Sequence, residues 1–394
     1  MRKLFYCGIE KLQARYSLQL QEWNERVFKR RGIDYEIVYG EDLTGDQIVT
    51  GSVLDAHGRS FYSLTQISNL VKLMKEGKIT SEDIIFFEDA FTPGMESLFY
   101  IIDQVPAEYK PKIYVRFLAQ SVDPDDFVNR EGMYDWMRPY EQMLDSRVAG
   151  ILVASEEFVA HLRIAGFKAP IYVTGLPYGK SEVLERIPDI KPISERTKRV
   201  GFAARWDDEK QPELYMKLAM DYYDIDPTVE FAVFTGHPKL KSNNKFNTDF
   251  AEKMQTMRNV NFKVYTGLTK NDYYGLLADS WVLFNCALQD WVSNTVSEAS
   301  TFGTIPLYPA YRSFPEVFAN NQNFMYTPWS IDDAKTKLQN MFSEPAKYDP
   351  TPVCDWQDGT IDRTLDVFLG IGEEWSRNEL NYRWHTARPK YTWK

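Results

Sequence analysis

Short apolar runs alternate along this chain with segments in which apolar residues recur at helical spacing. The clearest example is residues 281–312, where Trp281–Asn285 has the pattern of a buried strand, Val292–Phe302 that of a helix and Thr304–Leu307 that of a second strand. This order predicts a βαβ unit.

The same order recurs before this unit. Further strands are predicted at Lys3–Cys7, Tyr35–Tyr39, Ile84–Phe87, Ile113–Phe117, Gly150–Ala154, Ile171–Val173, Arg199–Ala203, Glu230–Phe234 and Val260–Tyr265. Helical patterns are predicted at Gln13–Arg31, 61–76, Ser155–Ala165, Asp332–Phe342 and Ile361–Asn378. In the second half, strand, loop and helix repeat at intervals of roughly 25–30 residues, which is typical of a parallel α/β architecture.

The length of the chain and one polar segment predict its division into domains. A chain of 394 residues is long for a single hydrophobic core and suits two domains. Residues 174–198 are polar and contain three prolines, so we interpret them as the connection between the domains. We expect domains at residues 1–175 and 176–360, followed by a C-terminal helix and tail at 361–394.

Composition excludes several classes of function. The net charge of −10 argues against a protein that coats nucleic acid non-specifically, because such binding needs clustered lysine and arginine. No apolar run approaches the roughly 20 residues of a membrane span, and the start MRKLFYCGIE lacks the core of a signal peptide, so we expect a cytoplasmic protein without a membrane partner. The three cysteines and four histidines show no metal-ligand spacing, and we predict no metal site.

The predicted helix within residues 281–312 begins in a way that suits an anion. Asn294, Thr295 and Val296 occupy its first turn, where unpaired N–H groups and the positive end of the helix dipole favour a diphosphate. Asp290 and Glu298 stand eight residues apart around this turn. An ordinary solvated helix start is the alternative interpretation.

Two cations follow the predicted strand Arg199–Ala203. Arg205 and Lys210 lie in the loop between this strand and the next helix, where both can face a diphosphate. Because three acids stand between them, a surface ion-pair cluster is the alternative.

Polar residues also follow two strands of the first half. Glu88 and Asp89 come directly after Ile84–Phe87, and Gln120 and Asp123 come shortly after Ile113–Phe117. Side chains at the exits of parallel strands point toward bound ligands, so these four are candidates for catalysis or acceptor binding. For Glu88 and Asp89, helix capping and turn formation are the alternative.

The string around Asp290 and Glu298 resembles the acid-x7-Glu segment of retaining glycosyltransferases of the GT-B fold. The order Arg205-Trp-x3-Lys210-x-Pro after a strand also resembles a GT-B loop. The resemblance implies two Rossmann-like domains facing a cleft, in which the first domain binds the acceptor, the second binds the nucleotide sugar and the last helix crosses back to the first. It further implies that Glu298 binds the ribose, that Asp290 lies near the donor sugar, and that Arg205 and Lys210 neutralise the leaving diphosphate.

The same resemblance implies that the loop Tyr265–Leu268 contacts the nucleotide base through backbone groups. We therefore expect the donor to contact Gly8, Gly236, Tyr265, Gly267 and Leu268 in addition to the residues above. The expected donor is UDP-glucose or a UDP-pentose. No metal ion is required, because cationic side chains can replace one.

Within GT-B, the chain resembles the DNA α-glucosyltransferases of T-even bacteriophages. The resemblance rests on Gly8-Ile9-Glu10 with the segment Tyr16–Trp23, and on Ser297–Ala299 with Gly303–Pro306. It implies transfer of a sugar to a hydroxyl on a modified pyrimidine in phage DNA, in the cytoplasm of the host. The phage enzyme has a His-Asp-His run where this chain has Leu118–Ser121, so Asp123, Glu88 or Asp89 becomes the candidate to act on the acceptor.

The final stretch Asn381–Lys394 interleaves basic and aromatic residues, which suits contact with phosphates and unstacked bases. A tail that packs on the surface through its aromatic residues is the alternative.

Three other functions are left open. One is a glycosyltransferase that acts on a cell-envelope glycan or lipid, and the basic segment Glu22–Arg31 would then be its membrane-docking feature. The others are a sugar-nucleotide-binding or DNA-binding protein that has lost catalysis, and an epimerase.

Overall fold

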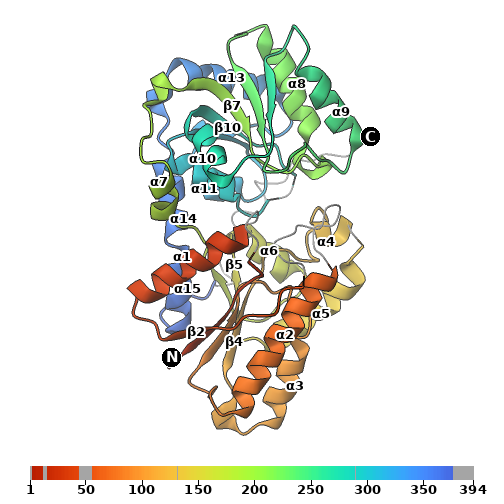
Figure 1. Cartoon of the computed structure of the whole chain (residues 1–394), viewed down its shortest axis with the longest axis vertical. Coiled ribbons are helices and arrows are strands. Elements are labelled where there is room, and N and C mark those ends of the chain that lie inside the picture. The colour runs from red at the N-terminus through yellow and green to blue at the C-terminus, as the bar shows by residue number, and fades with distance from the viewer. Residues whose placement is uncertain (1, 12–15, 44–55, 131, 289, 376–394) are drawn as a thin grey trace. The chain divides into compact units, whose positions relative to one another are not determined.

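The computed structural model describes residues 2–11, 16–43, 56–130, 132–288 and 290–375 (Figure 1). The chain forms two compact units. The first runs from the N-terminus to Pro177 and includes the segment that starts at Gly359, and the second comprises Tyr178–Asp358. Within the described residues each unit contains a six-stranded parallel sheet, so the predicted α/β class is confirmed. The basic and aromatic stretch Asn381–Lys394 lies outside the described residues.

The first unit is built on a sheet with the strand order β2-β1-β3-β4-β5-β6. Every residue of β1, β3 and β5 is buried, which is why these strands appear in the sequence as continuous apolar runs. The strands are β1 (Leu4–Cys7), β2 (Tyr35–Ile37), β3 (Ile84–Phe87), β4 (Lys112–Arg116), β5 (Gly150–Val153) and β6 (Ile171–Val173).

Helices cover both faces of this sheet. In Figure 1, α1 and α15 lie on one side and α2, α3 and α5 on the other. The helices are α1 (Tyr16–Arg30), α2 (Ala56–Lys75), α3 (Glu96–Gln104), α4 (Phe127–Arg130), α5 (Tyr134–Arg147), α6 (Glu156–Ile164) and α15 (Thr360–Phe368).

Helix α15 is shorter than the sequence pattern predicts. The expected helix 361–378 ends at Phe368, because Gly370 adopts a left-handed conformation with φ of 77°. Arg31, at the end of α1, holds α15 through ion pairs of 3.0 Å to Asp362 and 2.8 Å to Asp366. The last described helix therefore belongs to the first unit.

The second unit has the strand order β12-β11-β10-β7-β8-β9. Strand β7 pairs with β8 on one side and with β10 on the other, so the order of strands reverses between β7 and β10. The strands are β7 (Thr197–Phe202), β8 (Glu230–Phe234), β9 (Phe262–Tyr265), β10 (Ser280–Phe284), β11 (Ile305–Pro309) and β12 (Met325–Tyr326).

The segment 174–198, predicted to be a connection, contains a helix and the start of a strand. Helix α7 begins at Lys180, and β7 begins at Thr197 rather than at Arg199. Prolines lie outside α7 and therefore do not interrupt it. The helices of this unit are α7 (Lys180–Arg186), α8 (Pro212–Tyr223), α9 (Lys245–Met254), α10 (Lys270–Ala278), α11 (Asn294–Thr301), α12 (Phe314–Val317), α13 (Ile331–Ser343) and α14 (Thr351–Asp358).

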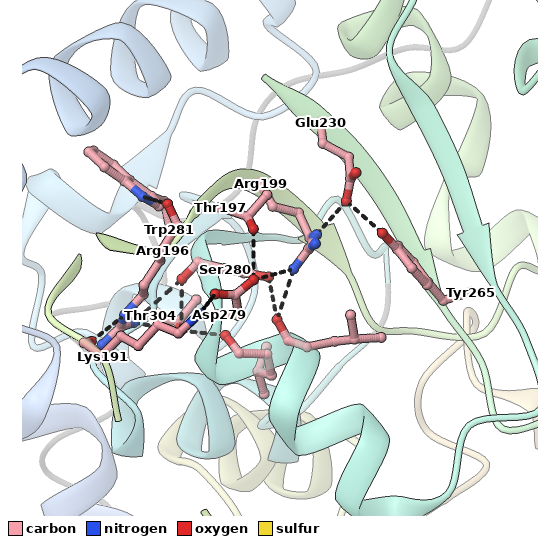
Figure 2. A network of polar contacts seen from close by, with 12 residues as sticks. Lys191, Arg196, Thr197, Arg199, Glu230, Tyr265, Asp279, Ser280, Trp281 and Thr304 are labelled. Carbon is pink, nitrogen blue, oxygen red and sulfur yellow. Dashed lines mark hydrogen bonds and ion pairs between the residues drawn. The ribbon is translucent and has the colours of Figure 1, made fainter. Parts of the chain in front are cut away.

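A polar network joins the strands of the second unit near their amino ends (Figure 2). Glu230, the first residue of β8, accepts hydrogen bonds of 2.5 Å from Arg199 Nε of β7 and 2.6 Å from Lys263 Nζ of β9. Asp279 accepts one of 2.7 Å from the Thr197 hydroxyl. Arg199 and Glu230 are both buried, so their charges are compensated within the protein.

None of the helices formed by the described residues is both long enough and apolar enough to cross a membrane.

Candidate functional site

The candidate site of the second unit lies where the strand order reverses, between β7 and β10. In open parallel sheets, ligands bind outside the carboxyl ends of the strands at such a point. The two loops that leave β7 and β10 contact each other directly. Leu288 N–H donates to the Glu209 carbonyl at 2.8 Å, and the Gln211 side-chain amide donates to the Cys286 carbonyl. The residues predicted from these two loops are therefore neighbours in space.

The two predicted cations both pair with acids of these loops. Arg205 Nη2 lies 2.7 Å from Glu209 Oε1, and its side chain remains 45% exposed. Lys210 is buried, and its Nζ lies 3.7 Å from Asp290 Oδ2 of the other loop. The structure thus brings together Lys210 and Asp290, which are far apart in sequence. Of the two cations, Arg205 is the more exposed.

Glu298 is buried in α11 and accepts hydrogen bonds from three side chains of α10. Its donors are Lys270 Nζ at 2.8 Å, the Tyr273 hydroxyl at 2.8 Å and the Tyr274 hydroxyl at 3.0 Å. Burial and the nearby Glu298 raise the pKa of Tyr273 well above its usual value, so this hydroxyl stays a donor. A carboxylate has about four acceptor positions, so Glu298 keeps capacity for one more hydroxyl.

These three donors were missed from the sequence. Lys270, Tyr273 and Tyr274 occupy positions i, i+3 and i+4 of one helix, which places them on one face. The sequence does show a cation and two tyrosines on one face of this helix. It does not show that their common partner is Glu298, because Glu298 lies in a different helix.

The first turn of α11 is bounded by hydroxyl groups. Ser293, the N-cap residue, does not cap the helix with its side chain. Its hydroxyl instead lies 2.6 Å from that of Thr295, which is 3.2 Å from the Tyr308 hydroxyl. Asn294 and Thr295 are half-buried and Val296 is buried, so Val296 can meet a ligand only through its backbone.

The loops after β8 and β9 are joined by backbone hydrogen bonds. Gly267 N–H donates to the His237 carbonyl at 2.7 Å, and Leu268 N–H donates to the Thr235 carbonyl at 3.3 Å. A methyl group on Gly236 would lie 3.3 Å from the Leu268 carbonyl, so the two loops pack closely. The Tyr265 hydroxyl donates to Glu230 at 3.0 Å and belongs to the network of Figure 2, and its carbonyl accepts the Thr235 N–H at 3.0 Å.

The first unit has a second candidate site where its strand order reverses, between β1 and β3. Arg59 of α2 is buried and pairs with Glu10 after β1 and with Asp89 after β3, the latter at 3.0 Å. Gln66 of α2 donates to the Gly8 carbonyl at 3.0 Å. Burial raises the pKa of Asp89, and the Arg59 guanidinium opposes that shift. Arg59 and Gln66 were missed from the sequence, because they lie within a helix rather than after a strand.

Comparison with known proteins bears on the fold. Neither a protein-family model nor a curated protein matches the sequence. Solved structures do match it. Sucrose-phosphate synthase from Thermosynechococcus elongatus superimposes with a TM-score of 0.64 and 9% identity, covering 94% of this chain and 97% of that one.

Two further structures match as broadly. A glycosyltransferase from Rickettsia africae gives a TM-score of 0.62 at 11% identity, over 94% of this chain and 98% of that one. HepE from Anabaena, solved with UDP and glucose, gives a TM-score of 0.56 at 11% identity. The match covers 94% of this chain and 99% of that one. The chain has a GT-B-like fold. The predicted GT-B fold is thereby confirmed.

In this GT-B-like chain, the other candidates after β3 and β4 are enclosed. Glu88 accepts a hydrogen bond of 2.6 Å from Arg116 Nε, and Arg116 also donates to Thr174 and Thr364 at 2.9 Å each. Glu88 has no exposed surface, and burial raises its pKa. This pair joins β3 and β4 to α15, which is a structural role.

Asp123 and Gln120 are likewise fully buried. Asp123 accepts the Asp125 N–H at 3.0 Å in a turn of the loop after β4. The Asp89 side chain is 15% exposed to solvent. Of the four polar candidates in the first unit, Asp89 is therefore the one that a ligand reaches without a rearrangement.

Within the described ranges, no group of three or more His, Cys, Asp and Glu side chains is arranged to hold a metal ion.

Proposed function

We propose that this protein transfers a sugar from a UDP-sugar to a hydroxyl group. The observation that carries the proposal is the arrangement where β7 and β10 diverge. Lys210, Asp290 and the buried Glu298 come from loops or helices that follow these two strands. Cations suit a diphosphate and a buried carboxylate suits ribose hydroxyls. The UDP bound to HepE, which has the same fold, supports UDP as the nucleotide.

Each residue has a defined part in the proposed reaction. The bond between the anomeric carbon and the diphosphate oxygen breaks, and a bond from the acceptor oxygen to that carbon forms. Arg205, Lys210 and the backbone N–H groups of Asn294–Val296 stabilise the negative charge on the departing UDP. Asp89 orients the acceptor hydroxyl or takes up its proton. We expect retention of the anomeric configuration, as in the retaining enzymes that the sequence resembles.

The acceptor that we propose is a hydroxyl on a modified pyrimidine of bacteriophage DNA. Support comes from the sequence resemblance at residues 8–23 and 297–306. The donor sugar is glucose or a pentose. The enzyme would then act in the cytoplasm of the infected cell.

The experiment incubates the full chain with UDP-glucose or a UDP-pentose and DNA that carries hydroxymethylated pyrimidines. Digested nucleosides are then analysed by mass spectrometry. A mass increase of one sugar on the modified nucleoside is the expected result. Release of UDP without any DNA product would keep the donor chemistry and move the acceptor to an envelope glycan or lipid. Failure to bind UDP would overturn the proposal.

A further inference from the structure

Three aromatic rings near the carboxyl end of β3 form a cluster with one ring exposed. The Trp136 ring of α5 stacks on Tyr140, with 5.0 Å between ring centroids and 16° between planes. Its centroid also lies 5.2 Å from that of Phe91. The Tyr140 hydroxyl donates to the Thr92 carbonyl at 2.7 Å, which fixes the supporting ring. Tyr140 and Phe91 are buried, whereas Trp136 is 44% exposed.

This arrangement differs from a single exposed tryptophan, because the ring is held in position before any ligand binds. An exposed aromatic ring can bind the flat apolar face of another ring. Since Trp136 is already packed on two rings, little side-chain freedom is lost on binding.

The aromatic cluster is continuous with the candidate acceptor site. Phe91 N–H donates to Asp89 Oδ1 at 3.0 Å, and the Phe91 carbonyl accepts hydrogen bonds of 3.1 and 2.6 Å from Arg59 Nε and Nη2. Phe91 therefore contacts Asp89 through its backbone and Trp136 through its ring. Trp136 and the carboxylate that is proposed to act on the acceptor hydroxyl therefore share Phe91 as a neighbour.

Charge narrows the kind of ring that fits. Burial raises the pKa of the Tyr140 hydroxyl, the acids Glu96 and Asp89 raise it further, and the cation Arg59 opposes them. Arg59 is itself paired with both Glu10 and Asp89, so the surroundings of the cluster are acidic. Acidic surroundings repel phosphate and accept hydrogen bonds from hydroxyl groups.

We propose that Trp136 binds the flat face of the uncharged ring that carries the accepting hydroxyl. A modified pyrimidine and a pyranose share this chemistry, and any phosphate attached to the acceptor would lie away from the cluster. The identification of this ring as the acceptor rests on the proposed transfer reaction. Binding of the ring itself can be measured without that reaction.

The test is saturation-transfer NMR on the full chain with two separate probes, hydroxymethyldeoxycytidine and methyl glucoside. The variants are Trp136→Ala and Trp136→Phe, and Trp356→Ala is the matched control, because Trp356 is 39% exposed and lies in the other unit. We expect at least one probe to bind the native chain. Affinity should fall about tenfold or more in Trp136→Ala, be largely kept in Trp136→Phe and be unchanged in Trp356→Ala.

The two probes distinguish the sources of the ring, since binding of the nucleoside alone indicates DNA and binding of the glucoside alone indicates a glycan. Equal binding by native protein and Trp136→Ala, or binding of neither probe, would overturn the inference. UDP affinity is measured in parallel by calorimetry. Loss of ring binding in Trp136→Ala with UDP affinity intact supports the inference. A native chain that binds the ring but not UDP contradicts only the proposed transferase function.

Discussion

The Glu298 carboxylate lies 2.8 Å from Lys270 Nζ, in a contact between two neighbouring helices of the second unit. Replacing Glu298 with alanine removes the carboxylate that is proposed to accept hydrogen bonds from the ribose. It also removes the common partner of the three side-chain donors of α10. UDP affinity, measured by calorimetry, should fall at least about tenfold, because hydrogen bonds to a charged group contribute about 1.5–3 kcal/mol. Glu344→Ala removes an exposed carboxylate of the same unit and should leave UDP affinity unchanged. Unchanged affinity in Glu298→Ala would remove Glu298 from the donor site.

Arg205→Ala should lower the rate of sugar transfer by roughly a hundredfold, because the exposed guanidinium would stabilise the leaving diphosphate. Initial rates at saturating donor concentration measure this effect. Lys217→Ala is the matched control, since Lys217 forms an ion pair of the same i, i+4 spacing with Asp221 at 2.9 Å. A nearly normal rate for Arg205→Ala would make its pair with Glu209 an ordinary surface ion pair.

Asp89→Asn should reduce sugar transfer by about a hundredfold or more, since the amide can accept the Phe91 N–H bond but cannot take up a proton. Slow hydrolysis of the UDP-sugar without acceptor should continue at the native rate. Asp103→Asn provides the control, because Asp103 is an exposed partner of Arg147 in the same unit. Equal transfer by the Asp89 and Asp103 variants would exclude Asp89 from acting on the acceptor.

Glu141 makes the stability of the first unit depend on pH near neutrality. Burial raises its pKa to about 7, although Ser121 donates to it through both backbone and hydroxyl. The unfolded value is about 4.3, so the folded state binds more protons between roughly pH 4 and 7 and its stability falls as pH rises through that range.

Glu141→Gln should therefore raise the melting temperature at pH 8 and change it little at pH 4. The upper limit of this stabilisation is about 4 kcal/mol, at about 1.4 kcal/mol for each pKa unit. Thermal unfolding followed by circular dichroism at both pH values measures it. A lower melting temperature at pH 8 would show that the ionised carboxylate is stabilising.

Glu230 makes the stability of the second unit fall as pH decreases, which is the opposite of the effect of Glu141. Burial alone would raise its pKa, but hydrogen bonds from Lys263 and Arg199 outweigh burial and lower it. The depressed pKa contributes stability above about pH 4.3, which is lost as pH falls through the folded value. Glu230→Gln should reduce the melting temperature at pH 7 and flatten its decline between pH 5 and 3. An unaltered acid profile would contradict this role.

The sequence predicted strands more reliably than helices, for a physical reason. Ile84–Phe87 and Glu230–Phe234 have the predicted bounds, because a parallel strand covered on both faces is a continuous apolar run. Helix α5 was missed, since Pro139 lies inside it and Trp136 exposes an aromatic ring that breaks the apolar period. Its aromatic cluster could not be inferred without knowing that α5 packs beside the loop after β3.

The sequence by itself determined the α/β class and pointed to Arg205, Lys210, Asp290 and Glu298, because strand exits and helix starts are local features that a pattern reveals. Tertiary structure alone decided their partners. Lys210 meets Asp290, and Glu298 meets Lys270, only because β7 lies beside β10 and α10 beside α11. Tertiary structure also enclosed Glu88 and Asp123 and left Asp89 partly exposed. Burial depends on which distant segments cover a residue, and local sequence does not contain that information.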